Sequence, residues 1–342
     1  TLFRSLQKIA ELSNYNAKNK NGQTALMIAA QNTMTTSTDQ TVELLLSLPD
    51  INCDLMDNNG RTALMIAAIT SRTTSTEYTV KLLAEKSNCN IQKQNGLTAL
   101  MLAAKYSSTS STENTVEILS QYTDCNIQDN NGWTALMFAA KNSSYAGTST
   151  NKTVQILANK TDTSLKTKKG WTALMICACC SGTLSDIETV RILTDAATCN
   201  IQNDEGNTAL MLAALCSASS SNDTTVEILA SITNVNIQNS DGNTALIMAS
   251  MYCNSVSTLR TVKILLEKSN VNIVNKDGNT ALMMASKYTA TTSSEDVLSL
   301  LSPLTDHKIK NKNGHNVMYI ASTSKESTEN TPYILVKYAK HI

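Results

Sequence analysis

Nine cysteines are the side chains of this chain best suited to chemistry, because thiolates bind metal ions and form disulfides. Four of them, Cys53, Cys89, Cys125 and Cys199, stand seven residues before a recurring glycine. The same position in the other copies holds Tyr15, Thr163, Val235, Val271 and His307. Because cysteine alternates with valine there, we interpret it as a small buried hydrophobe. Equivalent positions on packed helices lie about 10 Å apart, too far for a disulfide, whose Cα atoms must lie within about 7 Å.

Cys177, Cys179, Cys180 and Cys216 form a denser cluster. Cys177 occupies a small-residue position and is predicted to be core, whereas the other three fall at the exposed end of a helix. The cluster has no paired Cys-x-x-Cys spacing and no histidine near it, which argues against zinc. The chain also has no Gly-rich phosphate loop, nucleophile elbow or paired-carboxylate site. The sequence therefore predicts no enzyme, no metal and no cofactor, and reduced thiols predict the cytoplasm.

Charge and hydropathy exclude several classes of binding partner. Lys plus Arg and Asp plus Glu both number 28, and this balance argues against nucleic acid, whose binding depends on neutralising phosphates. No apolar run approaches the length of a membrane span, so no membrane contact is predicted. No small-molecule substrate is expected either. Because the chain starts at Thr1, we expect it to be a piece of a longer protein.

A sequence repeat runs along the chain and sets where all of these residues lie. The pattern Gly-x-Thr-Ala-Leu-Met recurs every 36 residues, with two intervals of 38. It starts at Gly22, Gly60, Gly96, Gly132, Gly170, Gly206, Gly242, Gly278 and, in degenerate form, Gly314. A fixed period of this size predicts a stacked array. We divide residues 1–342 into an N-terminal half-repeat or cap (1–21, with a helix over Leu2 to Leu12), eight repeats (22–313) and a C-terminal capping repeat (314–342), in which Pro332 starts the last helix.

One repeat, residues 96–131, shows the expected elements. Thr98 caps a short helix from Ala99 to Tyr106. The Ser/Thr-rich segment after it has no apolar periodicity, so we predict a mobile loop that tolerates deletion. Ser111 or Thr112 caps a second helix, which runs from Glu113 to about Gln121 with Val116 and Leu119 on one face. An extended stretch then leads to the turn at the next glycine. Neither helix is long enough to be stable alone in water, so stacking must hold them.

This pattern resembles the ankyrin repeat, whose Gly-x-Thr-Pro-Leu-His-x-Ala-Ala appears here as Gly-x-Thr-Ala-Leu-Met-x-Ala-Ala. The resemblance covers essentially the whole chain. It implies an all-α, ankyrin-type α-solenoid of helix-loop-helix repeats with short β-hairpin fingers. Its Asn-Ile-Gln fingers and Ser/Thr loops resemble ankyrin arrays of giant amoeba-infecting viruses or of protists, and a viral protein would act in the host cytoplasm.

The resemblance also implies where a protein partner binds: on finger tips and on the exposed end of the first helix. Among these positions we select the aromatic, apolar and basic residues, together with the lysines of an unusually basic finger. They are Leu97, Tyr106, Trp133, Lys141, Lys166, Lys168, Lys169, Trp171, Tyr252 and Tyr288. Two alternatives stay open: each tryptophan packs on its neighbouring finger, and the basic finger is a solvated charged turn. The polar tips from Asn207 to Asn279 are expected to face solvent.

The function predicted from these observations is a non-catalytic scaffold that binds a partner protein on its concave face of fingers and first helices. One alternative is the substrate-recognition part of a ubiquitin-ligase adaptor, which requires an F-box-like segment that is absent from these 342 residues. A second is a structural or virion component. Ankyrin surfaces are generic platforms, so the sequence does not name the partner.

Overall fold

The computed structural model describes residues 14–144, 147–195 and 197–339. The helix expected over Leu2 to Leu12 lies outside these residues. Contacts divide the chain into two units, Thr1–Leu165 and Lys166–Ile342, and each is described by itself.

Each unit is built from pairs of short helices. The first unit contains α2 (Ala25–Gln31), α3 (Asp39–Leu46), α4 (Ala63–Thr70), α5 (Glu77–Ala84), α6 (Ala99–Lys105), α7 (Glu113–Tyr122), α8 (Ala135–Lys141) and α9 (Asn151–Ala158). The second contains α10 (Ala173–Cys180), α11 (Ile187–Leu193), α12 (Ala209–Leu215), α13 (Asp223–Ile232), α14 (Ala245–Met251), α15 (Leu259–Leu266), α16 (Ala281–Lys287), α17 (Glu295–Leu301), α18 (Val317–Thr323) and α19 (Thr331–Ala339). We call the two members of each pair helix 1 and helix 2.

Threonine caps start these helices where the sequence predicts. The Thr98 hydroxyl accepts a hydrogen bond from the Met101 amide (3.2 Å), and Thr112 does the same for the Thr115 amide (3.0 Å). Helix α6 ends at Lys105, one residue before the predicted end. The final helix, α19, begins at Thr331 with Pro332 in its first turn, where proline costs no helical hydrogen bond.

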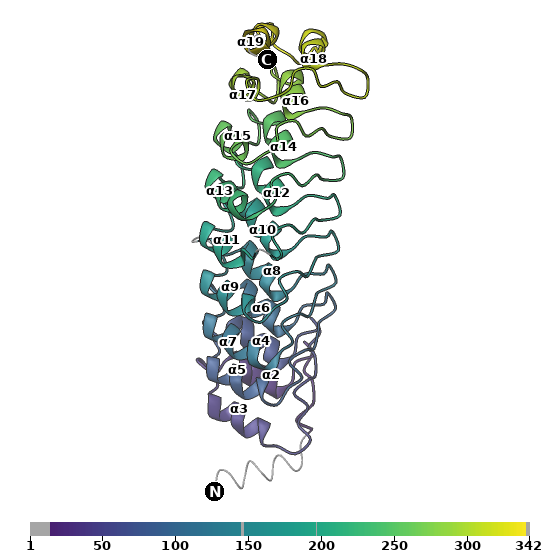
Figure 1. Cartoon of the computed structure of the whole chain (residues 1–342). Coiled ribbons are helices and arrows are strands. Elements are labelled where there is room, and N and C mark those ends of the chain that lie inside the picture. Colours follow the sequence, from purple (N-terminus) through teal and green to yellow (C-terminus); the bar gives the residue numbers. More distant parts are fainter. Residues whose placement is uncertain (1–13, 145–146, 196, 340–342) are drawn as a thin grey trace. The chain divides into compact units, whose positions relative to one another are not determined.

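Stacking supplies the stability that short helices lack. In each unit helix 1 contacts helix 1 of the next repeat, and helix 2 contacts helix 2, so two columns form (Figure 1). The core lies between the columns, where Leu100, Met101, Val116 and Leu119 are at most 1% exposed. The fingers lie beside the helix 1 column, on the side away from helix 2 (Figure 1).

The fingers are hydrogen-bonded turns and not the predicted β-hairpins. In the finger before α8, the Asp129 amide donates to the Trp133 carbonyl (2.9 Å) and the Gly132 amide donates to the Asp129 carbonyl (2.9 Å). The Trp133 amide donates to the Asp129 carboxylate (2.8 Å), so it does not complete a ladder with the Asp129 carbonyl, and no strand occurs in the described ranges. Glycine is required at Gly96, whose φ is 85° and where an added Cβ would lie 2.5 Å from the Asn130 nitrogen of the next finger.

The stretch that leads into each finger also turns, where we predicted extended chain. The Ile127 amide donates to the Asp124 carbonyl (3.3 Å), while the Asp124 carboxylate accepts from the Asn126 amide (2.9 Å). The Asp124 amide in turn donates to the Asn90 side chain of the preceding repeat (2.9 Å). Asx turns of this kind give the backbone a local partner, which favours a turn over an extended chain.

The Ser/Thr loops contact one another, which the sequence did not lead us to expect; their mobility and their tolerance to deletion stay predictions. Ser107 and Ser111 are 0% exposed, although both belong to the loop after α6. The Thr153 hydroxyl donates to the Ser107 hydroxyl (2.7 Å), which also lies 3.2 Å from the Ser149 hydroxyl of the next loop. The Ser108 amide donates to the Thr148 carbonyl (3.1 Å). Hydroxyl pairs and backbone bonds thus replace the apolar anchors that the sequence lacks.

These hydroxyl contacts recur along both units, and we call them the hydroxyl ladder. It consists of Ser71, Ser107, Ser111, Ser149, Thr115 and Thr153 in the first unit and Ser181, Ser217, Ser221, Ser257 and Thr225 in the second. Acidic residues at the start of helix 2 add a second link between repeats. Glu113, for example, accepts a hydrogen bond from the Thr150 hydroxyl of the next repeat (2.6 Å).

Candidate functional site

The candidate surface of the first unit is centred on α8. Trp133 directly precedes the N-cap residue Thr134, and Phe138 is the fourth residue of the helix. Their ring centroids lie 5.1 Å apart with an interplanar angle of 35°. This spacing is that of a hydrophobic staple, in which the residues before the cap and one turn into the helix pack together. Part of the Trp133 ring therefore holds the finger onto α8, and the rest stays exposed, since Trp133 is only half-buried.

Two lysines lie over the aromatic rings. The Lys141 Nζ is 5.5 Å from the Trp133 ring centroid, and the Lys105 Nζ is 5.1 Å from that of Tyr106 and 6.0 Å from that of Phe138. These distances suit cation–π attraction. We call Lys105, Tyr106, Trp133, Phe138 and Lys141 the aromatic–lysine cluster; all five are half-buried. It joins three predicted residues, Tyr106, Trp133 and Lys141, to Lys105 and Phe138.

Phe138 was not selected from the sequence. It occupies the variable position of Thr-Ala-Leu-Met-x-Ala-Ala, which is buried in α4, α6, α10 and α12 as Ile66, Leu102, Ile176 and Leu212. Phe138 could have been selected from the sequence, because only two phenylalanines occur in the chain and a hydrophobic staple to Trp133 needs an apolar residue at this position.

Leu97, which was selected as a binding residue, is buried and offers a partner little surface. Its side chain is 9% exposed. Leu97 holds the same position as Trp133, directly before an N-cap residue, in this case Thr98. A leucine at this position is short enough to be covered by the surrounding chain, whereas the indole of Trp133 extends beyond it.

The candidate surface of the second unit begins with the basic finger. Trp171 is half-buried, and its amide donates to the Thr167 hydroxyl (3.2 Å). Lys168 and Lys169 are exposed beside it. Lys166 is exposed too, but its Nζ donates to the Gln202 carbonyl of the next finger (2.8 Å). Lys166 therefore links two repeats, which leaves Lys168 and Lys169 as the more accessible positive charges.

Tyr252 and Tyr288 cap the C-terminal ends of α14 and α16. Both are half-buried, and the Lys287 Nζ lies 4.9 Å from the Tyr288 ring centroid. They stand two and three repeats beyond Trp171 along the chain. The selected residues of this unit are thus a Trp–Lys finger and a separate pair of tyrosines.

The polar finger tips contact one another, whereas the sequence suggested that they face solvent. Asn207 is buried at 6% exposure, and its side-chain oxygen accepts a hydrogen bond from the Asn239 amide group (2.9 Å). Asn243 and Asn279 accept in the same way from Asn275 (3.1 Å) and Asn311 (3.0 Å). These asparagines connect one finger to the next, so they belong to the scaffold.

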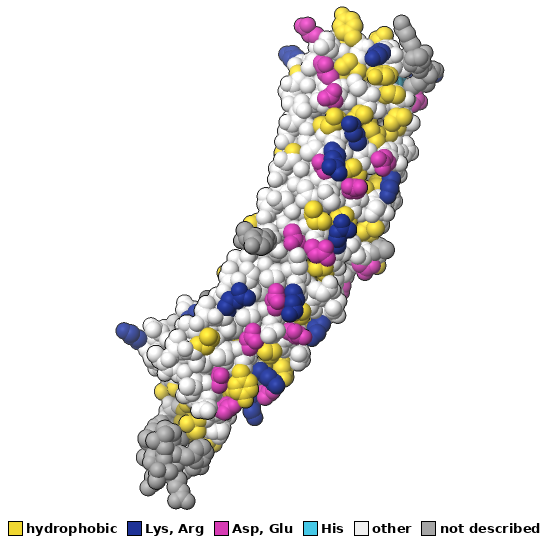
Figure 2. Space-filling view, turned by 90° about the vertical axis from the view of Figure 1, so that its left-hand side faces the viewer, with side chains coloured by type: hydrophobic (Ala, Val, Ile, Leu, Met, Phe, Trp, Pro, Cys, Tyr) yellow, Lys and Arg dark blue, Asp and Glu magenta, His cyan; other side chains and the backbone are white. Residues whose placement is uncertain are grey.

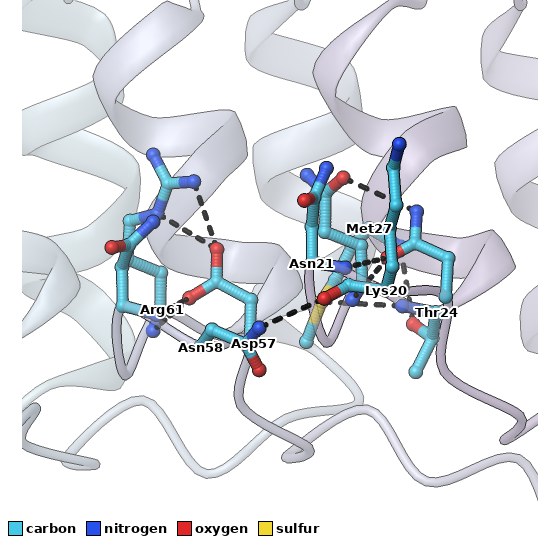
Figure 3. Close-up of polar contacts among 10 residues, drawn as sticks. Lys20, Asn21, Thr24, Met27, Asp57, Asn58 and Arg61 are labelled. Atoms are coloured by element: carbon cyan, nitrogen blue, oxygen red, sulfur yellow. Dashed lines mark hydrogen bonds and ion pairs between the residues drawn. The ribbon is translucent and has the colours of Figure 1, made fainter.

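Arg61 holds the corresponding position in the first unit and is fixed by Asp57. The guanidinium lies 2.8 Å from the buried Asp57 carboxylate, to which its Nε also donates (3.0 Å; Figure 3). Burial acts to raise the pKa of Asp57, but the backbone and side-chain hydrogen bonds from Arg61 outweigh it and hold that pKa below its usual 3.8. Asn58 binds the preceding finger through its amide to the Asn21 carbonyl (3.1 Å; Figure 3).

The cysteines do not create a metal centre within the described ranges. There, no three His, Cys, Asp or Glu side chains come close enough to hold a metal ion. Cys53, Cys89, Cys125 and Cys199 are buried, as predicted for their column. Burial raises the pKa of the Cys89 thiol to about 11 and also raises that of Cys177, so these thiols are unreactive at neutral pH. None of the described helices has the length and apolar character needed to cross a membrane.

Comparison with known proteins agrees with the repeat geometry. A family model described as ankyrin repeats in three copies matches residues 2–78, 74–149, 143–230 and 215–304. No curated protein matches the chain. The matched segments cover most of the sequence, and the capped helix pairs, stacked columns and projecting fingers are the elements of this repeat. The chain belongs to the ankyrin repeat family.

Proposed function

We propose that this chain is a non-catalytic scaffold that binds a partner protein through its fingers and the exposed side of helix 1. Ankyrin repeats are in general protein–protein interaction modules, and proteins built from them are typically not enzymes. The face, the residues and the chemistry of the partner are our proposal.

The aromatic–lysine cluster is the observation that carries it. Trp133, Tyr106 and Phe138 bring three half-buried rings to one face of the first unit, and such aromatic groups supply most of the binding energy at protein interfaces. Neither Lys105 nor Lys141 forms an ion pair with another residue in the described part of the chain. The cluster thus combines apolar area with uncompensated positive charge.

The helix 2 side also carries exposed aromatic side chains, among them Tyr78 and Tyr122, but its charges are mixed. Figure 2 shows that acidic and basic side chains are interspersed on this side in both units. Mixed charge of this kind gives no single-sign field to attract a partner. In the first unit Lys152 is paired with Glu113 (3.6 Å), and in the second Arg260 is paired with Glu227 (3.8 Å).

The partner expected from this chemistry is a protein segment that carries acidic residues next to apolar ones. Its carboxylates would pair with Lys105 and Lys141, and its apolar side chains would cover the exposed edge of Trp133. In the second unit Trp171 with Lys168 and Lys169, and Tyr252 and Tyr288 with Lys287, offer the same two kinds of contact.

The test is affinity capture followed by binding measurements with the purified partner. Trp133→Leu removes the indole but keeps an apolar staple, because Leu97 fills this position naturally one repeat earlier. We expect this variant to retain its melting temperature and to bind about 30-fold more weakly, the equivalent of about 2 kcal/mol. Charge reversal at Lys105 and Lys141 should slow association and reduce its dependence on salt.

Lys81→Glu is the matched control, since Lys81 is an exposed lysine on helix 2 of the same unit. It should bind like the wild type. If Trp133→Leu folds normally and captures the same proteins with unchanged affinity, the proposed face is wrong. If Lys81→Glu is as damaging as the reversal at Lys105 and Lys141, the effect is one of net charge and not of this surface.

A further inference from the structure

Two cysteines of adjacent repeats touch in the second unit. Cys179 lies near the end of α10, and Cys216 follows the last residue of α12. Their sulfur atoms are 3.7 Å apart, and both side chains are half-buried. The spacing argument from the sequence does not apply to them, because it concerns equivalent positions. Cys179 is the first residue after the paired small residues of its repeat and Cys216 is the second, and this stagger brings the sulfurs together.

We propose that Cys179 and Cys216 form a reversible disulfide that joins the two repeats when the protein meets a glutathione-type disulfide. A disulfide needs its sulfurs at about 2.05 Å, so each sulfur must move by less than 1 Å on average from the observed 3.7 Å. Cys216 lies outside the regular helix, as the C-cap residue, so side-chain and local backbone rotations can supply this movement.

The loop that carries Cys216 is already attached to the end of α10. The Ser220 hydroxyl donates to the Cys179 carbonyl (2.7 Å), and the Gly182 amide donates to the Ser220 carbonyl (2.9 Å). The Ser181 and Ser221 hydroxyls lie 3.1 Å apart. These bonds hold the two thiols together in the reduced protein, so closing the bridge requires little additional ordering.

The reaction is two successive thiol–disulfide exchanges. The Cys179 thiolate attacks one sulfur of glutathione disulfide, forming a mixed disulfide and releasing one glutathione thiolate. The Cys216 thiolate then attacks the Cys179 sulfur and displaces the second glutathione. Two electrons pass from the cysteine pair to the glutathione disulfide, and the two thiol protons end on two molecules of glutathione. Excess glutathione reverses both steps.

The surroundings of the two thiols predict the pH dependence of the rate. The pKa of Cys179 is raised, first by its hydrogen bond with Cys180 and also by burial, although the bond with Cys216 acts in the opposite direction. The pKa of Cys216 is raised by its hydrogen bond with Cys179 and by burial. Since thiolates are the attacking species, the reaction should be slow near neutral pH and accelerate as the pH rises.

The first measurement is peptide mapping of the native chain, without reduction, after incubation in buffers with graded ratios of glutathione disulfide to glutathione. Trypsin cuts after Lys169, Arg191 and Arg260, so Cys179 and Cys216 fall in peptides 170–191 and 192–260. A bridge between them joins these two peptides and lowers the intact mass by two hydrogens. Amide exchange of α10 and α12 should become slower in the oxidised protein, because each repeat then opens only with its neighbour.

Three single variants identify the sulfurs. Cys179→Ser and Cys216→Ser should each abolish the joined peptides, and Cys180→Ser, the matched control, should retain them. Each of the two peptides contains three cysteines, so fragmentation of the joined wild-type peptides must also place the bond on Cys179 and Cys216; this measurement decides the question even if a variant fails to fold. The proposal is overturned if the native protein yields only glutathione adducts or unchanged thiols at the most oxidising ratio. It is equally overturned if the joined peptides persist without Cys179 or Cys216, or disappear without Cys180.

Discussion

The hydroxyl ladder predicts a large effect for the loss of one oxygen atom at Ser107. Its hydroxyl is 0% exposed, accepts a hydrogen bond from Thr153 (2.7 Å) and lies 3.2 Å from the Ser149 hydroxyl. In Ser107→Ala, Thr153 can still use Thr150, whose hydroxyl is 3.2 Å away, but Ser149 loses its Ser107 partner while 2% exposed. A buried polar group deprived of its partner costs about 1–3 kcal/mol. We therefore expect a loss of about 2 kcal/mol.

Native-state hydrogen exchange is the suitable assay, because repeat arrays do not unfold in one step and a global free energy is poorly defined for them. A local loss of about 2 kcal/mol corresponds to exchange about 30-fold faster. The acceleration should appear in α6 to α9, which flank the substituted loop, and fade in more distant repeats.

Thr109→Ala is the matched control within the same loop. Thr109 is exposed, and water can replace the bond from its hydroxyl to the Tyr106 carbonyl (3.3 Å). Its effect should stay within about 0.5 kcal/mol. Equal, small effects of Ser107→Ala and Thr109→Ala would refute the ladder as a source of stability. A double-mutant cycle with Thr153→Val adds a second check, because groups in direct contact should give non-additive losses.

Three further changes test other parts of the scaffold. Ala139→Pro, in the middle of α8, should cost about 3 kcal/mol or more, and its loss of exchange protection should be strongest in the adjoining repeats. Arg61→Ala should cost about 1–2 kcal/mol, since it removes a charged donor. The pKa of Asp57 is depressed in the folded protein, so the ionised Asp57 carboxylate stabilises the fold above about pH 4, and this stabilisation is lost as the pH falls. Between pH 7 and pH 2 the melting temperature should therefore fall less in Arg61→Ala than in the wild type. Asn239→Ala removes the bond to Asn207 and two acceptor bonds within the finger, and should cost about 2 kcal/mol by exchange. Asn239→Asp keeps the two acceptor bonds and should cost less.

The elements that depend on neighbouring residues could be predicted from the sequence. Thr98 and Thr112 cap their helices as expected, because a cap needs only a hydroxyl and an amide three residues later. Val116 and Leu119 are buried on one face of α7, because the helical period places them together. The same locality explains why α6 was predicted to within one residue.

The contacts between the loops were not predicted, because only the amino-acid composition of each loop was considered and not the position of each serine in the repeat. Ser107 and Ser111 are four residues apart, and the pairs Ser181 and Ser185, or Ser217 and Ser221, repeat that spacing in the same register. Aligning these serines by repeat, as we did for the cysteines, would have shown that they hold fixed positions. A contact between residues about 40 apart is visible in a single sequence only through such periodicity.

The site residues depended on side-chain environments that the sequence does not state. Leu97 and Trp133 share the position before the N-cap, yet one is buried and the other half-buried, because the larger ring cannot be covered completely. Lys166 looks like Lys168 and Lys169 in a basic run, but only Lys166 reaches the neighbouring finger. Such differences depend on side-chain size and reach across repeats, and the repeat period does not encode them.

The end of helix 1 combines variable residues that point outward with a buried serine that packs between repeats, and this arrangement favours a binding function over an inert spacer. Lys105 and Tyr106 are half-buried and vary between repeats; Ile69 and Thr70, for example, hold the same two positions one repeat earlier. The next residue, Ser107, is fully buried within the hydroxyl ladder, and its counterpart remains serine in most repeats. Adjacent positions can differ in this way because the helix ends there, and the change in backbone direction places the side chain of Ser107 between the repeats. Outward residues can thus change without loss of packing, so recognition can diversify on a constant scaffold. A spacer gains nothing from half-buried aromatic rings with lysines beside them, whereas an interface does.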